Sequence, residues 1–126
     1  MVAPLDDKKI VILCEDDADL RAVYAVVLSK EGYRLELAPD GDVALDLIRK
    51  YNWDLLLLDI MLPKKDGLTL MKIIYEEKLK KGKIVMLTNL NTEAIIDEAF
   101  KHGADGYLIK SQITPGSLLD EIKPYF

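Results

Sequence analysis

Residues 55–59 read Leu-Leu-Leu-Leu-Asp, a short apolar run that ends on a carboxylate. Three further apolar runs end in the same way on polar or charged residues. They are Ile10 to Cys14 before Glu15, Asp16 and Asp17; Ile84 to Leu87 before Thr88; and Tyr107 to Ile109 before Lys110. Short bounded runs of this kind are typical of strands buried on both faces of a parallel sheet, whose ends meet along one edge. Since open α/β sheets bind ligands at the carboxyl ends of their strands, we expect these polar residues to form one site.

Segments with apolar residues at helical spacing alternate with these runs, and residues 34–38 add a weak strand between the first two helices. Five strand and helix units in alternation predict an α/β fold, a doubly wound five-stranded parallel sheet with helices on both faces. We expect residues 1–126 to form one domain, with residues 1–8 as an N-terminal extension.

Caps and turns predict where some of these helices begin and end. The third helix is expected to follow the loop from Pro63 to Gly67 and to run to Gly82. The fourth is expected to begin at Asn91 or Thr92 and to turn Phe100 inward, and Thr114 before Pro115 predicts the start of the fifth.

Composition excludes several classes of protein. With 126 residues, 50% of them hydrophobic and 31% charged, the chain can bury the core of one soluble domain. A single cysteine permits no internal disulfide, and neither a signal segment nor a membrane span is evident, so we expect a cytoplasmic protein. A net charge of −5 disfavours direct nucleic-acid binding. We interpret the cluster Lys78, Lys80, Lys81 and Lys83 as the solvated end of the third helix.

The residues at the strand ends favour phosphoryl chemistry. Taken alone, Asp59 and the residues 15–17 could be helix caps and helix starts. Carboxylates on adjacent strands repel each other, however, unless a cation or a proton intervenes. Mg²⁺ (or Mn²⁺) fits because it accepts carboxylates and phosphate oxygens, while Thr88 can donate a hydrogen bond and Lys110 can neutralise charge. The set predicts magnesium-assisted phosphoryl transfer to a carboxylate.

At these residues the chain resembles the receiver domains of two-component response regulators. The matching features, in order and spacing, are Glu15-Asp16; Asp59 followed by Met61-Leu62-Pro63 and Gly67; Thr88; and the segment 106–110, Gly-Tyr-Leu-Ile-Lys. Each is weak alone, but four separate strand ends agree. The resemblance implies a (βα)5 flavodoxin-like fold with strand order 2-1-3-4-5.

The resemblance also implies roles. Asp59 would accept a phosphoryl group from a histidine kinase or a phosphotransfer protein. Glu15, Asp16, Asp59 and the backbone carbonyl of Met61 would hold magnesium. Thr88 and Lys110 would contact the phosphoryl group, and Tyr107 would swing between outward and inward positions and so change the surface of the fourth helix, fifth strand and fifth helix. An output protein, or an output domain beyond this chain, would respond.

Two residues depart from the family pattern. Ser111 stands where most receivers follow the lysine with a proline in a cis bond, which leaves the isomer of the Lys110–Ser111 bond open. Asn89 replaces the usual small residue after the threonine and is expected to narrow access to the phosphate. The last helix lacks the pattern of dimerising receivers, so we expect a monomer or a weak phosphorylation-dependent dimer.

Two positions are expected to set the lifetime of the phosphoryl group. In receivers, the residues two past the phosphoacceptor and two past the threonine flank the path of the attacking water, and here they are Met61 and Leu90. Neither side chain can orient a water, which predicts slow dephosphorylation.

The leading hypothesis is therefore a phosphoacceptor switch with no turnover as an enzyme, and no contact with nucleic acid or membrane. The alternatives are a degenerate receiver that serves as a protein-binding scaffold, a small magnesium-dependent phosphohydrolase and a flavodoxin-like redox protein. Glu15, Asp16 and Asp17 would repel a flavin phosphate, which argues against the last.

Overall fold

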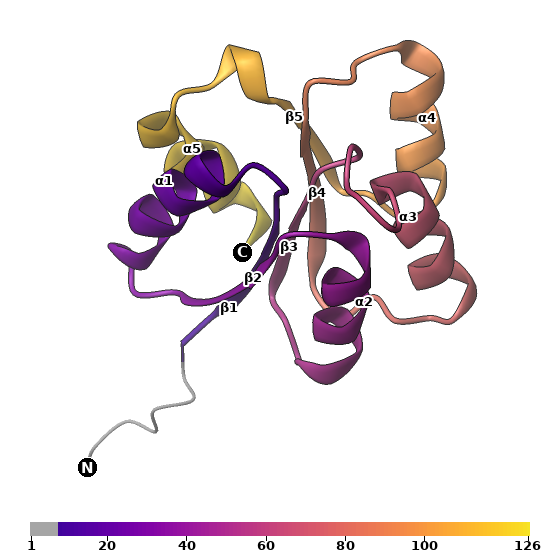
Figure 1. The fold of residues 1–126 in the computed structure, drawn as a ribbon, viewed down its shortest axis with the longest axis horizontal. Helices are drawn as coiled ribbons and strands as arrows, with labels where there is room; N and C mark the ends of the chain where they lie inside the picture. The colour runs from indigo at the N-terminus through magenta and orange to yellow at the C-terminus, as the bar shows by residue number, and fades with distance from the viewer. Residues whose placement is uncertain (1–7) are drawn as a thin grey trace.

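The computed structural model describes residues 8–126, which form a single parallel sheet flanked by helices (Figure 1). The strands lie in the order β2-β1-β3-β4-β5, as predicted. The strands are β1 Ile10–Cys14, β2 Arg34–Ala38, β3 Leu55–Leu58, β4 Lys83–Thr88 and β5 Gly106–Ile109. The helices are α1 Ala18–Ser29, α2 Gly41–Lys50, α3 Gly67–Glu76, α4 Glu93–Lys101 and α5 Pro115–Ile122, with short 3-10 turns at η2 Lys110–Gln112 and η3 Lys123–Tyr125. The predicted extension, residues 1–8, lies almost wholly outside the described residues.

The sheet separates two apolar cores. Figure 1 shows α1 and α5 on one face and α2, α3 and α4 on the other. Because strand side chains alternate, β1 supplies Val11 and Leu13 to the first core and Ile12 and Cys14 to the second. All four residues of β3 are fully buried, as a central strand covered on both faces requires.

Side-chain caps place the helix starts beside the carboxyl ends of the strands. Asp17, Asp40 and Asp66 each accept a backbone N–H three residues on, at the start of α1, α2 and α3. Thr92 caps α4 and Thr114 caps α5, as predicted. The strand-to-helix turns at this edge are therefore fixed by hydrogen bonds.

The prediction that the third helix runs to Gly82 is wrong. Helix α3 ends at Glu76, and Lys78 adopts a left-handed backbone conformation with φ 56° that stops the helix. The lysines that follow are therefore not at a helix end. Lys80 pairs with Asp105 at 2.9 Å, and Lys81 donates to the carbonyls of Ile48, Arg49 and Tyr51 at the end of α2.

Two further expectations concern helix α4 and the peptide bond just after β5. Phe100 does not face inward: its side chain is 45% exposed and lies near the Tyr107 ring, because α4 packs on the sheet mainly through Ala99. The Lys110–Ser111 bond is trans, since residues 8–126 contain no cis peptide.

Among the helices described, none has the length and apolar character of a membrane span.

Candidate functional site

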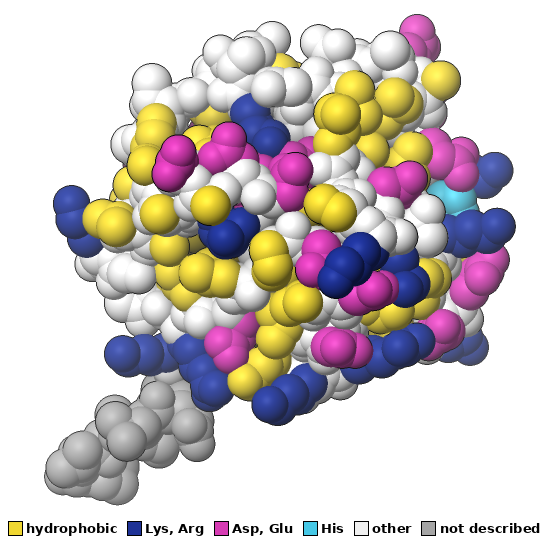
Figure 2. Space-filling model, in the orientation of Figure 1, with side chains coloured by type: hydrophobic (Ala, Val, Ile, Leu, Met, Phe, Trp, Pro, Cys, Tyr) yellow, Lys and Arg dark blue, Asp and Glu magenta, His cyan; other side chains and the backbone are white. Residues whose placement is uncertain are grey.

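The four polar strand ends predicted from the sequence do converge. Glu15 follows β1, Asp59 follows β3, Thr88 ends β4 and Lys110 follows β5, and all four line a pocket of about 800 Å³. Glu15, Asp59 and Thr88 are buried, which is uncommon for such residues unless they are paired. In the view of Figure 2, acidic side chains (magenta) lie on the surface near the start of α1.

Lys110 joins the two buried carboxylates. Its Nζ lies 2.7 Å from Glu15 Oε1 and 2.5 Å from Asp59 Oδ2. Burial alone would lower the pKa of Lys110, but the hydrogen bonds with Asp59 and Glu15 outweigh it and raise the pKa. Burial raises the pKa of Glu15, and Lys110 opposes that rise. The ammonium is therefore held charged between two acids that would otherwise repel each other.

Asp59 is fixed by backbone as well as by Lys110. Its Oδ1 accepts the N–H of Met61 at 3.1 Å, and its own N–H donates to the carbonyl of Cys14 on the neighbouring strand. Gly67, the first residue of α3, lies so close that a Cβ there would be 2.4 Å from the Asp59 carbonyl oxygen. Only glycine lets α3 begin against this turn, so the presence of glycine at position 67 has a steric cause.

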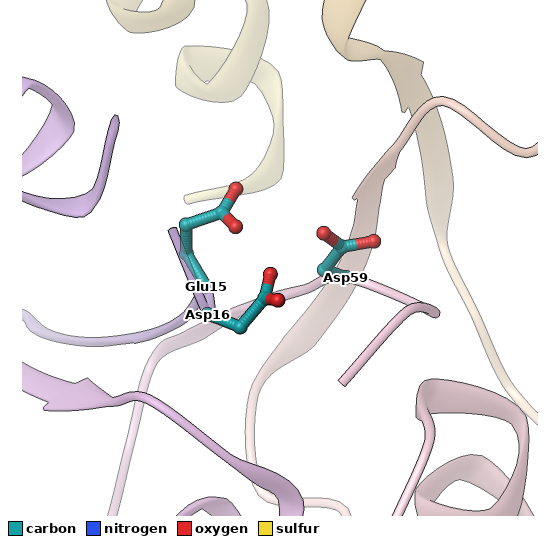
Figure 3. Close-up of side chains that lie close together, drawn as sticks. All are labelled: Glu15, Asp16 and Asp59. Atoms are coloured by element: carbon teal, nitrogen blue, oxygen red, sulfur yellow. The ribbon is translucent and has the colours of Figure 1, made fainter. Parts of the chain in front are cut away.

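Three carboxylates are placed to share a cation. One oxygen from each of Glu15, Asp16 and Asp59 lies within 4.8 Å of the others, and Figure 3 shows all three groups bordering one space. Asp16 is exposed, whereas the other two are buried. Hard oxygen ligands with room left for water are the donor set that Mg²⁺ prefers, so the residues fit a divalent metal.

A side-chain hydrogen bond joins the loop after β4 to strand β5. Thr88 Oγ1 accepts the N–H of Leu90 at 3.4 Å, and the Tyr107 hydroxyl donates to the Leu90 carbonyl. Burial, followed by the charge of Asp59, raises the pKa of Tyr107, so this phenol stays a donor at neutral pH. The half-buried ring of Tyr107 thus connects the strand end that carries Thr88 with the α4 face.

The two positions predicted to set the phosphoryl lifetime both lie at the pocket. Met61 is 62% exposed and Leu90 is half-buried, and both contribute to the lining. Their side chains present no strong hydrogen-bonding group to a water there.

Sequence reasoning missed two contacts. Arg21 Nη1 donates to the backbone carbonyl of Glu15 at 2.8 Å and supports the acidic turn from α1. Asn89 Oδ1 accepts the backbone N–H of Ser111 at 2.9 Å. Arg21 lies on the predicted first helix, but nothing in the pattern indicated where its long side chain would reach. Cys14 is buried in the apolar core, and burial raises the pKa of its thiol far above the ordinary value.

Comparison with known proteins agrees with this geometry. Residues 11–123 match the family model of the response regulator receiver domain. The transcriptional regulatory protein RprY of Bacteroides fragilis is 38% identical to this chain over 106 residues, which make up 84% of this chain and 44% of that protein. A CheY-like receiver domain protein from Methanospirillum hungatei superposes with a TM-score of 0.85 at 27% identity, over 94% of this chain and 93% of that one.

A third relative was solved in a modified state. A response regulator of Burkholderia pseudomallei, described as holding a phosphorylated aspartic acid, a calcium ion and citrate, has a TM-score of 0.79 and 27% identity over 89% of this chain and 65% of that one. The chain spans less than half the length of the curated transcriptional regulators it matches.

Proposed function

This chain belongs to the receiver-domain family of two-component response regulators, and from that premise we propose that it is a phosphorylation-controlled switch with Asp59 as its phosphoacceptor. The observation that carries the proposal is the Asp59 carboxylate itself. It is buried at the end of the central strand, bound to Lys110, and beside two further carboxylates that fit a divalent metal. A helix cap needs none of these neighbours.

The proposed reaction is a displacement at phosphorus. One Asp59 oxygen forms a bond to phosphorus while the phosphorus–nitrogen bond of a donor phosphohistidine breaks, and that bond's electron pair leaves with the imidazole, which takes up a proton. Lys110 offsets the added negative charge. Thr88 donates its hydroxyl to a phosphoryl oxygen, and turning toward that oxygen would loosen the 3.4 Å hydrogen bond that Thr88 Oγ1 accepts from the Leu90 N–H.

Glu15, Asp16, Asp59 and the Met61 carbonyl would hold Mg²⁺ or Mn²⁺. When bound, the cation supplies positive charge that carboxylates and phosphoryl oxygens share. The relative from Burkholderia pseudomallei, with its phosphorylated aspartate and calcium ion, supports both the acceptor and the metal assignments.

The proposed partners are a histidine kinase or a phosphotransfer protein upstream, and an output protein or domain downstream, in the cytoplasm. Self-catalysed phosphoryl transfer and slow hydrolysis would be the only chemistry, with no enzymatic turnover. The curated relatives are longer transcriptional regulators, which supports an output beyond the receiver. We propose that the receiver itself is a monomer or a weak phosphorylation-dependent dimer.

The test is labelling with acetyl phosphate and magnesium, followed by mass spectrometry of the intact protein. Wild type should gain one phosphoryl mass, and Asp59→Asn none. Asp17→Asn is the matched control, because Asp17 lines the same pocket and asparagine caps a helix as well as aspartate does. It should be labelled like wild type.

Labelling of Asp59→Asn to the wild-type extent would refute the assignment. A protein that takes up no phosphate and fails to bind a beryllofluoride phosphate mimic would instead be a phosphorylation-independent scaffold. Repeated release of phosphate from the donor would indicate a hydrolase.

A further inference from the structure

The two residues that depart from the family pattern bind each other. Asn89 directly follows Thr88, and Ser111 directly follows Lys110. Their loops are 22 residues apart in sequence, yet Asn89 Oδ1 accepts the Ser111 backbone N–H at 2.9 Å. Both residues line the pocket that contains Asp59. The hydrogen bond therefore joins the neighbours of the two groups proposed to contact the phosphoryl group.

This contact needs both departures at once. A proline at position 111 would have no N–H to donate, and a glycine or alanine at position 89 would have no acceptor. The donor comes from the backbone, so the serine hydroxyl is not required. Asn89 and Ser111 are thus one feature of the site rather than two separate substitutions.

The bond acts on a loop that is already held at the next residue. The Leu90 carbonyl accepts the Tyr107 hydroxyl from β5, while Asn89 accepts the N–H at the start of η2, just after β5. The β4–α4 loop is therefore fixed at two consecutive residues to one segment, residues 107–111. Lys110 lies within that segment, and its ammonium holds Asp59 and Glu15.

We infer that Asn89 is a positioning residue that acts through Lys110 and Thr88, holding their two loops together so that both groups reach Asp59 as a unit. The functional consequence of this inference depends on the proposed phosphoacceptor role. An exposed neutral hydrogen bond of this kind changes an equilibrium or a rate by a few-fold to about tenfold.

The experiment is a double-mutant cycle with Asn89→Ala and Ser111→Pro, because each removes one end of the same bond. Ser111→Ala is the control, since it keeps the backbone N–H. The rate of phosphorylation by acetyl phosphate at saturating magnesium should fall a few-fold to about tenfold in each single variant, and no further in the double variant. Ser111→Ala should match wild type.

Two measurements separate positioning from a general loss of structure. Affinity for magnesium alone should stay at the wild-type value, because Glu15, Asp16 and Asp59 are unchanged. The Lys110 ammonium protons, followed by NMR without any phosphodonor, should exchange faster with water in Asn89→Ala and in Ser111→Pro. Opening of the pocket by the smaller alanine cannot explain a matching effect of Ser111→Pro, which keeps the asparagine.

Additive losses in the double variant, or wild-type phosphorylation of Asn89→Ala, would overturn the inference. If wild type itself accepts no phosphate, the phosphoacceptor proposal fails. The ammonium exchange rates still decide the positioning role in that case: unchanged exchange in both single variants would refute it.

Discussion

At the scale of single residues, the site combines one ammonium with three carboxylates that differ in burial. Glu15 and Asp59 are buried and bound to Lys110, whereas Asp16 is exposed beside them. Because Asp16 makes no bond to Lys110 among the described contacts, its removal should disturb the folded protein least of the three. Asp16 is therefore the residue with which to test metal binding.

We predict that Asp16→Ala weakens magnesium binding by about tenfold or more, since it removes both a ligand and a negative charge. A magnesium titration followed by NMR measures the affinity. Asp19→Ala is the control, because Asp19 is an acidic residue in the first turn of α1 that is not part of the carboxylate cluster. Equal affinity of wild type and Asp16→Ala would remove Asp16 from the ligand set.

Met61 and Leu90 carry a second prediction at this scale. Replacing Met61 with Asn and Leu90 with Glu should speed dephosphorylation by at least about tenfold, because the polar groups can orient the attacking water at the pocket. The swap of Met61→Leu with Leu90→Met keeps both positions apolar at similar volume and should leave the rate unchanged. Loss of phosphate is followed at equal magnesium concentration. A polar double variant as slow as wild type would show that water positioning does not set the lifetime.

At the scale of helices and strands, the sequence pattern predicted those features that neighbouring residues in the chain determine. Apolar runs predicted the strands, and parallel pairing brings their ends together, so Glu15, Asp59, Thr88 and Lys110 could be placed at one edge in advance. The end of α3 could not, because Lys78 adopts its left-handed turn without the glycine that usually marks one.

Contacts between segments that lie far apart in the sequence could not be predicted either. The bond from Ser111 to Asn89 depends on where two loops pass each other, and the bonds from Lys81 to the end of α2 cross about 30 residues of chain. Neither leaves a periodic signal. Phe100 is a different case, because its helical spacing resembles that of a core residue although α4 leaves it half-exposed.

Lys81 provides the prediction for this scale. It donates to three carbonyls at the end of α2, at 2.8, 3.1 and 2.6 Å, where a helix has no internal donors left. Lys81→Met should lower the free energy of unfolding by about 1 kcal/mol, a modest value because the lysine is solvent-exposed. Urea denaturation measures it. Lys72→Met, on the exposed face of α3, should change stability little, and an equal loss there would argue against a capping role.

At the scale of the whole molecule, the site lies at one edge of the sheet, and its connections lead mainly toward α4 and β5. The Leu90 carbonyl holds the Tyr107 hydroxyl, and the Tyr107 ring lies 6.5 Å from the Phe100 ring on α4, measured between centroids. Phe100 and Tyr107 are both partly exposed. A change at Thr88 can therefore reach a surface that a partner could contact. Helices α2 and α3 cover the same face of the sheet as α4, but among the contacts described neither of them contacts the Tyr107 ring or its hydroxyl.

We therefore predict that the beryllofluoride phosphate mimic with magnesium alters α4, β5 and α5 more than α2 and α3. The mimic adds negative charge at Asp59 and presents fluorine atoms where a phosphoryl group would present acceptor oxygens, so Thr88 should turn toward it and release the Leu90 N–H, which frees Tyr107 to move inward. Hydrogen exchange, with α2 as the internal reference, measures the change. Tyr107→Phe keeps the ring but loses the hydroxyl bond, and it should reduce the response in α4 and β5 while the mimic still binds. Differences confined to α2 and α3, or a full response in Tyr107→Phe, would show that the signal leaves the site by another route.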